Sequence, residues 1–464
     1  MTDFKNRDHI CFVGIGGIGM SALALYFAMG GYSVAGYDRT ESDITIKLAE
    51  NGCHVTHTDS IESLPPVFGD PRFRDRVLVV FTPAIPSGNS ILTWFRTMGY
   101  TIRKRAEVLG EISSRTDTIA VAGTHGKTTV STMTAHLLKQ SETDCSAFLG
   151  GISKNYDSNL LLGEGKYTVM EADEYDRSFH RLSPLIAVIT SLDPDHLDIY
   201  GDHDSMVRGY NEFIGKIRPG GKLIASRSII PLLIIPPSLE TRTYGFEEDA
   251  DYRAFAVERE GDHYRFSIQT PEGVKENLLF AFPGIINIAN LTAAIAVALI
   301  CGVTEQEIRK AVLLFQGVKR RFDIRINLPG LVYIDDYAHH PVEIKAFVSS
   351  VREYFGERKI TAIFQPHLFS RTRDHAEGFA EILDMLDEVI LLPIYPAREE
   401  PVEGVTSELI FRRMRSAKKQ MLEMKDLPDK LDVNNIDILL TIGAGSIDTL
   451  VSKIEEKLKR GMMK

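Results

Sequence analysis

Short apolar runs alternate with stretches of helical periodicity along this 464-residue chain. Near the start, His9 to Val13 is apolar, Met20 to Met29 has helical character up to Gly30, and Tyr32 to Tyr37 is a second apolar run. Short apolar runs bounded by glycines or polar clusters predict buried strands. Strands that alternate with helices predict a mostly parallel sheet with helices packed on its faces.

The same alternation returns twice further along the chain. A central unit has predicted strands beginning at Thr118, from Tyr167 to Met170 and from Leu185 to Thr190, and the run from Thr241 to Phe280 predicts a small β region. The predicted strands of a third unit are Val332 to Ile334, Lys359 to Phe364, Glu388 to Leu392 and Asp437 to Ile442. Helices are expected at Ala106 to Ser113, Asn287 to Cys301 and Val342 to Tyr354.

Composition narrows the class of protein. Apolar residues make up 44% and charged residues 25%, which is ordinary for a globular protein, and the length favours about three domains. The net charge of −10 argues against nonspecific binding to nucleic acid or membrane surfaces. The four cysteines are scattered, and no signal peptide or membrane span is recognisable, so we expect a cytoplasmic protein with reduced thiols and small-molecule partners.

A glycine-rich turn joins the predicted strand at Thr118 to a helical stretch. Gly123, Thr124, His125, Gly126 and Lys127 are followed by Thr128 and Thr129. In such a turn, backbone N–H groups face an anion, a lysine reaches the outer phosphates of a nucleotide and a hydroxyl binds Mg²⁺. Val121 replaces the first glycine of the usual motif, so a purely structural turn is the alternative.

A second glycine-rich turn spans residues 14 to 19, between the first predicted strand and helix. An acid, Asp38, ends the next strand. This layout presents a helix N-terminus to a pyrophosphate and a carboxylate to a ribose or base. A dinucleotide cofactor, another nucleotide diphosphate and a structural turn all fit. The loop from Thr82 to Gly88 follows a further strand, Val77 to Phe81, and is positioned to close over the same ligand.

Two acidic clusters follow strands of the central unit. Glu171 to Asp176 comes after one strand, and Asp193 to Asp198, with His196, comes after another. Carboxylates and an imidazole at such strand ends can hold Mg²⁺ against phosphates. Acids on solvated loops are the alternative.

Cations and histidines mark the third unit. Lys319, Arg320 and Arg321 adjoin a predicted domain hinge, and we place Arg371 and Arg373 at a strand end, where some of these cations are expected to contact anions. Asp335 to Pro341 contains two histidines directly after a strand.

Taken together, these motifs resemble those of the Mur ligases over nearly the whole chain. The segments that carry the resemblance are Gly14 to Met20, Gly123 to Thr129, Glu171 to Glu174 with Ser178 and Phe179, Asp195 and His196 with Tyr200, Asn287 and Asn290, Arg320 to Phe322, Asp335 to Pro341, Phe364 to His367 and Arg371 to Arg373. The resemblance implies an α/β protein with three domains, which we place at 1–105, 106–317 and 318–464. The first is Rossmann-like and binds a UDP sugar, the second is a phosphate-loop ATPase with a mostly parallel sheet, and the third is Rossmann-like and closes over ATP and an amino acid.

The resemblance also implies an activity, in which ATP and Mg²⁺ drive amide-bond formation between the lactyl carboxylate of UDP-N-acetylmuramate and L-alanine. ADP and phosphate are released, in the cytoplasmic synthesis of peptidoglycan precursors that cell division and cell shape require. The first glycine turn then holds UDP, and no redox cofactor is implied. A monomer or weak homodimer is expected.

Residue roles carried over from the family fall into four groups. Lys127, Glu171, His196, Arg321 and His340 are the expected catalytic residues, and Thr128, Glu171 and His196 the expected metal ligands. ATP is expected to contact Gly123, Thr124, His125, Gly126, Lys127, Thr128, Thr129, Asn287, Asn290, Arg321 and Asp336. The UDP sugar is expected to contact Gly14, Gly16, Gly17, Ile18, Gly19, Met20, Asp38, Thr82, Pro83, Ala84 and His125. The amino acid is expected to contact Tyr337, His339, Arg371 and Arg373.

The sequence departs from the family pattern at two places. Ile285 and Ile286 stand where an Arg-His pair often precedes Asn287, and Leu368 stands where arginine is common. Asn287 could equally cap its helix. The alternative functions are a ligase that attaches a recycled peptide to the same sugar nucleotide, and a switch that hydrolyses ATP without forming a bond.

Overall fold

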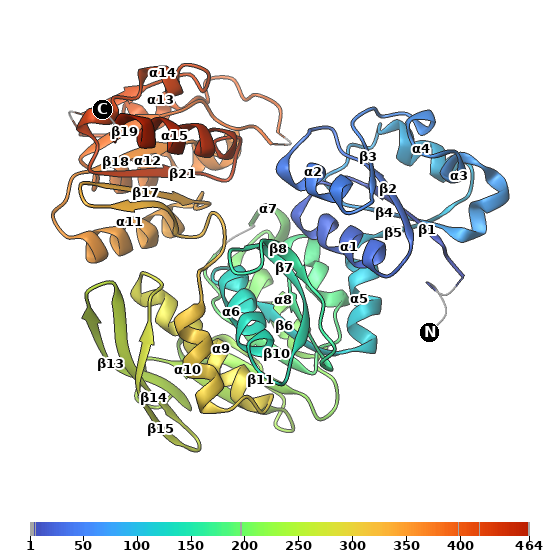
Figure 1. Cartoon of the computed structure of the whole chain (residues 1–464), viewed down its shortest axis with the longest axis horizontal. Helices are drawn as coiled ribbons and strands as arrows, with labels where there is room; N and C mark the ends of the chain where they lie inside the picture. Colours follow the sequence, from blue (N-terminus) through green and yellow to red (C-terminus); the bar gives the residue numbers. More distant parts are fainter. Residues whose placement is uncertain (1–3, 5, 195–196, 398, 417, 463–464) are drawn as a thin grey trace. The chain divides into compact units, whose positions relative to one another are not determined.

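The computed structural model describes residues 4, 6–194, 197–397, 399–416 and 418–462. Figure 1 shows three α/β domains along the chain, coloured blue, cyan to yellow, and orange to red. By internal contacts the chain divides into two compact units: Met1–Ala281 with Ile288–Gln316, and Phe282–Asn287 with Gly317–Lys464. The first two domains share the first unit. The predicted α/β class with three domains and mostly parallel sheets is confirmed.

The amino-terminal domain is built on a parallel sheet. Its described strands are ordered β3-β2-β1-β4-β5, and every printed pairing is parallel. The strands are β1 (His9–Val13), β2 (Ser33–Tyr37), β3 (His54–Thr56), β4 (Val77–Phe81) and β5 (Thr101–Lys104). The helices are α1 (Ile18–Met29), α2 (Asp43–Glu50), α3 (Pro66–Gly69), α4 (Ser90–Thr97) and α5 (Arg105–Arg115). The apolar runs become strands because both faces of this sheet are covered, which leaves β1 and β4 almost entirely buried.

The central domain has a long sheet with a parallel middle. In the described residues its order is β15-β14-β13-β12-β11-β10-β6-β9-β7-β8, and the pairs β13–β14, β14–β15 and β7–β8 are antiparallel. The strands are β6 (Asp117–Ala122), β7 (Cys145–Ser153), β8 (Ser158–Leu161), β9 (Tyr167–Glu171), β10 (Ile186–Ile189), β11 (Lys222–Ser226), β12 (Glu240–Gly245), β13 (Tyr252–Glu260), β14 (His263–Thr270) and β15 (Gly273–Phe280). The α-helices are α6 (Lys127–Lys139), α7 (Leu197–Tyr200), α8 (His203–Ile214), α9 (Ile285–Ile300) and α10 (Glu305–Leu314). Strands β12 to β15 confirm the predicted β region.

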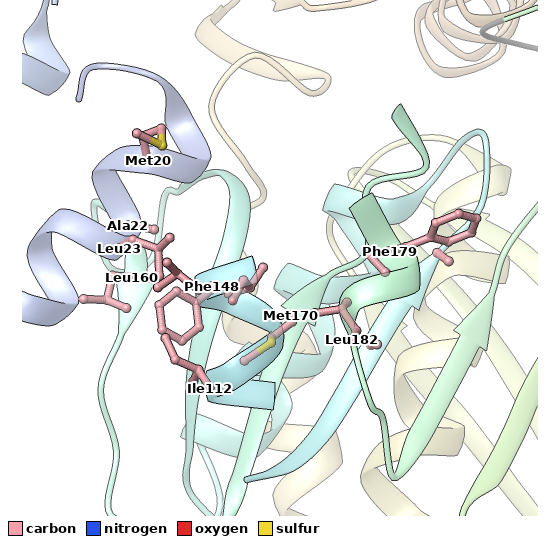
Figure 2. Close-up of a cluster of buried hydrophobic side chains, with 14 of the residues drawn as sticks. Met20, Ala22, Leu23, Ile112, Phe148, Leu160, Met170, Phe179 and Leu182 are labelled. Carbon is pink, nitrogen blue, oxygen red and sulfur yellow. The ribbon is translucent and has the colours of Figure 1, made fainter. Parts of the chain in front are cut away.

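A shared hydrophobic core joins the first two domains. Figure 2 shows Met20 and Leu23 of α1 in one buried cluster with Phe148 of β7 and Leu160 of β8. The amide of Asn159 adds polar bonds across the same contact, because its Nδ2 donates to the carbonyl of Ile18 (2.6 Å) and to Ser21 Oγ (2.9 Å). The start of α1 is therefore fixed to the central domain.

The carboxyl-terminal domain has a third sheet of the same kind. Its described strands are ordered β16-β17-β21-β18-β19-β20, and only the pair β16–β17 is antiparallel among them. The strands are β16 (Asp323–Leu328), β17 (Leu331–Asp336), β18 (Ile360–Phe364), β19 (Glu388–Leu391), β20 (Lys419–Met421) and β21 (Ile438–Ile442). The helices are α11 (Pro341–Phe355), α12 (Phe369–Leu383), α13 (Glu408–Phe411), α14 (Leu427–Lys430) and α15 (Asp448–Met462).

One predicted element is wrong in this domain. We placed Arg371 and Arg373 at a strand end, whereas β18 ends at Phe364 and both arginines lie in α12, which begins at Phe369. The missed start has a physical reason: the residue before the helix, Leu368, has φ +71° and ψ 139°, a conformation that bulky residues rarely adopt. Among the described residues, no helix is long and apolar enough to cross a bilayer.

Candidate functional site: two glycine turns and the acids between them

The central glycine turn links β6 to α6. Gly123 has φ +135° and Gly126 has φ +82°, and a Cβ at Gly123 would overlap Thr190 Oγ1 and approach the backbone N of Ser191 to 2.8 Å. Only glycine fits there, because both the conformation and the space exclude a side chain. Helix α6 begins at Lys127, so its first backbone N–H groups face the turn.

The segment after β10 braces this turn. Thr124 N donates to the carbonyl of Ser191 (3.0 Å), and His125 N donates to Ser191 Oγ (2.7 Å). Thr124 Oγ1 accepts a bond from Asp193 N (3.0 Å). His125 Nε2 lies 3.8 Å from a carboxylate oxygen of Asp193. The turn is thus held in shape by the protein, as anion binding by backbone amides requires.

The ammonium of Lys127 lies inside the turn. Nζ donates to the carbonyls of Gly123 (2.6 Å) and Thr124 (3.2 Å) and to Oε1 of Glu174 (2.8 Å). Burial alone lowers the pKa of Lys127, but the carboxylates of Glu174 and Glu171 outweigh it and leave that pKa above its ordinary value. Lys127 therefore stays charged.

Glu174 is a site residue that the sequence prediction left without a role. Its side chain is 1% exposed, and burial raises the pKa of its carboxyl to about 7 against the opposing charge of Lys127. Tyr200 Oη donates to the carbonyl of Glu174 (2.8 Å). The signal was present in the sequence, since Glu174 closes the first acidic cluster, but spacing does not reveal which acid of a cluster meets the lysine.

Glu171 ends β9 beside the same turn. Its carboxylate packs so closely on Gly150 that a Cβ there would overlap it. Thr128 is buried in the first turn of α6. A hydroxyl and a carboxylate are the hard oxygen donors that Mg²⁺ prefers, so these two residues fit the expected ion. His196 and Asp195 lie outside the described residues, and elsewhere in the described part no three His, Cys, Asp or Glu side chains are grouped to hold a metal.

The two predicted adenine-side asparagines differ in their surroundings. Asn290 Oδ1 would lie 2.9 Å from a Cβ at Gly126, so this amide packs against the turn. Asn287 instead lies inside α9, and its Nδ2 donates to the carbonyl of Pro283 (2.6 Å), which is not the acceptance of a backbone N–H that helix capping requires. The preceding Ile285 and Ile286 are exposed. Thr129 is buried in α6 beside Thr128.

The first glycine turn lies between β1 and α1. Gly16 N donates to Oδ2 of Asp38 (2.9 Å), and a Cβ at Gly14 would lie 2.9 Å from the Thr82 methyl group. The turn, the acid after β2 and the loop after β4 thus meet as predicted. Gly17 is the residue before α1, and Met20 is buried beneath the turn. Pro83 and Ala84 lie in the turn that Ile85 N closes on the carbonyl of Thr82 (3.1 Å).

A cation that no motif predicted lies between the two turns. Arg105, the first residue of α5, packs on Gly19 so closely that a Cβ there would overlap its guanidinium. Its Nη2 lies 3.3 Å from a carboxylate oxygen of Asp173. Arg105, Glu171 and Asp173 also line one small cavity. The first glycine turn is therefore connected to the acidic cluster within one compact unit.

In the carboxyl-terminal domain, a buried acid holds the loop after β17. Asp336 accepts bonds from the backbone N of Phe322 (2.7 Å) and of Ala338 (2.8 Å). Burial raises the pKa of its carboxyl to about 6, although the charge of Arg321 opposes this. The Arg321 guanidinium lies over the Tyr337 ring, 5.1 Å from its centroid. The neighbouring residue Arg320 donates from Nε to Oδ2 of Asp335 (3.1 Å).

Four predicted amino-acid residues separate into two groups. Tyr337 and His339 have ring centroids 5.4 Å apart, His339 and His367 are 5.5 Å apart, and Arg371 Nη1 lies 3.5 Å from His367 Nδ1. Arg373 is instead half exposed and bonded to Asp374 (2.8 Å). His340 precedes α11 and accepts a bond from Val342 N through Nδ1 (3.4 Å).

Three family models match the chain in succession. They are the Mur ligase family catalytic domain over residues 9–116, the Mur ligase middle domain over 121–298 and the Mur ligase glutamate ligase domain over 320–445. Their order follows the three domains of the fold.

Individual relatives match over nearly their full length. The UDP-N-acetylmuramate–L-alanine ligase of Phocaeicola vulgatus is 46% identical over 97% of this chain and 98% of its own. The solved UDP-N-acetylmuramate–alanine ligase of Thermotoga maritima is similar with a TM-score of 0.82, 27% identity, and coverage of 98% and 99%. A murein peptide ligase of Psychrobacter arcticus shares the fold, with a TM-score of 0.70, 22% identity, and coverage of 97% and 98%. On the evidence of its three matched domains and its full-length relatives, the chain belongs to the Mur ligase family.

Proposed function

We propose that this protein joins L-alanine to the lactyl carboxylate of UDP-N-acetylmuramate and couples the reaction to conversion of ATP into ADP and phosphate. The observation that carries the proposal is the buried lysine of the central turn, set beside two carboxylates and in the same unit as a second glycine turn. The names and the full-length identity of the relatives support the same reaction.

The chemistry requires activation of a carboxylate, which is a poor acyl donor. Transfer of a phosphoryl group to it creates a leaving group that the amine of alanine then displaces. In phosphoryl transfer, catalysis comes mostly from positioning and from neutralising charge. Lys127, with the backbone N–H groups of Gly126 and the first turn of α6, is proposed to bind the outer phosphates, since those of Thr124 and His125 already donate to Ser191.

A divalent cation, when bound, supplies further charge neutralisation at the phosphates. Thr128 and Glu171 are proposed to hold it with oxygen donors, together with His196. Asn290, which packs on the turn, is proposed to contact the nucleotide. In the third domain, Arg321 and Asp336 are proposed to contact ATP.

The first glycine turn is proposed to bind the diphosphate of the sugar nucleotide at the N-terminus of α1, with Asp38 directed to the nucleoside. When ligand arrives, Gly16 N has to be shared between Asp38 and the ligand, because Asp38 accepts that N–H here. Tyr337, His339 and Arg371 are proposed to contact L-alanine, and His340 to accept its proton. Arg373 is the weaker candidate, since it already pairs with Asp374.

The test is ADP release measured with UDP-N-acetylmuramate while single amino acids and a recycled tripeptide are supplied in turn. The proposal expects turnover with L-alanine that depends on the sugar nucleotide. Preference for the tripeptide would assign a peptide-recycling ligase. ATP turnover that ignores the sugar nucleotide would assign a switch.

A further inference from the structure

The ammonium of Lys127 has no hydrogen-bonding capacity left for a ligand as the structure stands. An ammonium carries three N–H donors and no acceptor. Lys127 directs bonds to Gly123 O, Thr124 O and Glu174 Oε1, at 2.6, 3.2 and 2.8 Å. A phosphate oxygen can reach this ammonium only by displacing one of them.

The three partners are not equivalent. The two carbonyls are neutral and belong to the turn itself, whereas Glu174 brings a carboxylate from the loop that follows β9. Hydrogen bonds between charged groups are stronger than those between neutral ones, so Glu174 is the strongest competitor for Lys127. Its side chain is 1% exposed and that of Lys127 is 15% exposed, so water screens the pair little.

Glu174 is also fixed in place. Its carbonyl accepts bonds from Tyr200 Oη (2.8 Å) and from Arg177 N (2.9 Å). The backbone of Glu174 therefore cannot withdraw without losing two bonds. A bound phosphate would have this carboxylate as a close neighbour of like charge, which opposes binding.

We propose that Glu174 is a positioning residue that holds Lys127 in the nucleotide-free protein and competes with the outer phosphates of ATP for its ammonium. The inference rests on the proposed function, because it takes ATP as the ligand of the turn. As a consequence of this competition, the protein binds nucleotide more weakly than the same turn would bind it without the Glu174 carboxylate. Glu174 thereby limits nucleotide retention when no reaction is under way.

The test is the affinity of full-length protein for a non-hydrolysable ATP analogue, measured by calorimetry at about pH 9, where Glu174 is ionised, and in EDTA so that no metal contributes. Glu174→Gln keeps the shape of the side chain and removes its charge. We expect it to bind the analogue about tenfold more tightly than the natural protein, the effect of losing one charged competitor. A structural defect would weaken binding, so a gain is diagnostic.

Asp173→Asn is the matched control. It removes one negative charge from the same loop but from a residue bonded to Arg105, not to Lys127. It should change the analogue affinity less than about twofold. An equal gain in both variants would overturn specific competition, and unchanged or weaker binding by Glu174→Gln would also overturn it. If the natural protein binds no analogue even when Mg²⁺ is supplied, the proposed function fails instead.

A second measurement needs no Glu174 variant to fold. In the natural protein with labelled lysine and glutamate, nuclear Overhauser contacts between the Lys127 ε-protons and the Glu174 γ-protons should be present without ligand. They should disappear when the analogue is added with Mg²⁺. Contacts that persist in the complex would contradict the displacement of Glu174.

Discussion

At the scale of single residues, buried carboxylates decide how the candidate site behaves. Glu174 and Asp336 each lie almost entirely inside the protein, one beside Lys127 and the other bonded to two backbone N–H groups. Burial penalises the charged form of a carboxyl, so both pKa values lie above the ordinary range. These acids organise loops at a cost in free energy of folding that depends on pH.

The raised pKa of Asp336 predicts how the free energy of unfolding depends on pH. The pKa of its carboxyl is raised from 3.8 to about 6 in the folded protein, so folding favours the protonated form. The resulting stabilisation of the folded protein is complete below the pKa that the carboxyl has in the unfolded state, and it is lost as pH rises through about 6. Asp336→Asn removes the titration, and the natural protein should lose about 1–3 kcal/mol relative to this variant between about pH 4 and about pH 7.

Urea unfolding of both proteins across that interval is the measurement. Asparagine offers one acceptor fewer for a backbone N–H, which lowers the stability of the variant by the same amount at every pH. The slope of unfolding free energy against pH therefore still reports the titration of Asp336. Parallel curves of unfolding free energy against pH would show that Asp336 does not titrate in this range.

At the scale of elements, the sequence predicts regular structure and its order well. Buried runs such as His9 to Val13 are strands because they lie in the middle of covered parallel sheets, so their composition and their structure agree. Glycines at the two turns predicted where helices begin. What the sequence could not provide was side-chain pairing between distant segments.

Particular residues show where the prediction stops. Arg105 meets Gly19 and Asp173 only through the tertiary fold, and no local spacing indicates it. Helix α12 was missed because Leu368 takes an unusual backbone conformation at its start. Glu174 was visible in a motif, yet its pairing with Lys127 depends on how β9 lies beside β6.

The central turn provides a prediction about an element. In Gly123→Ala, the added methyl group would overlap Thr190 Oγ1 at φ +135°. We expect a loss of roughly 2–4 kcal/mol in unfolding free energy together with loss of nucleotide binding. Gly261→Ala is the control, because that glycine also has positive φ (+64°) but open space around it.

The control should cost roughly 1–2 kcal/mol and leave nucleotide binding intact. Thermal unfolding and calorimetry on both variants measure the difference. Similar stabilities for the two variants would mean that the turn relaxes around a side chain, and that close packing on Thr190 is unimportant.

Helix α12 provides a second prediction of this kind. Arg371 lies near His367, while Arg373 on the same helix bonds Asp374. Arg371→Ala should raise the KM for L-alanine by about tenfold, the loss of one charged bond, while the KM for ATP changes less than about twofold. Arg373→Ala should leave both constants within about twofold.

Steady-state kinetics with each substrate varied in turn separates these outcomes. A larger effect of Arg373→Ala on L-alanine would reverse the assignment. If both variants had equally small effects on the KM for L-alanine, the start of α12 would not be part of the amino-acid site.

At the scale of the whole molecule, the proposed reaction requires that phosphate moves onto the sugar's carboxylate before alanine attacks. The first two domains share one compact unit, with Arg105 and Asp173 between the two glycine turns, so the proposed donor and acceptor sites belong to a single body. This arrangement favours direct transfer between substrates over hydrolysis of ATP by water.

Heavy oxygen in the lactyl carboxylate of UDP-N-acetylmuramate tests this most directly. If the carboxylate is phosphorylated, one of its oxygens leaves with the phosphate when the amine attacks. We expect inorganic phosphate that carries the label in step with amide formation, measured by mass spectrometry of both products. Unlabelled phosphate released alongside the amide would contradict it, because water would then have attacked ATP.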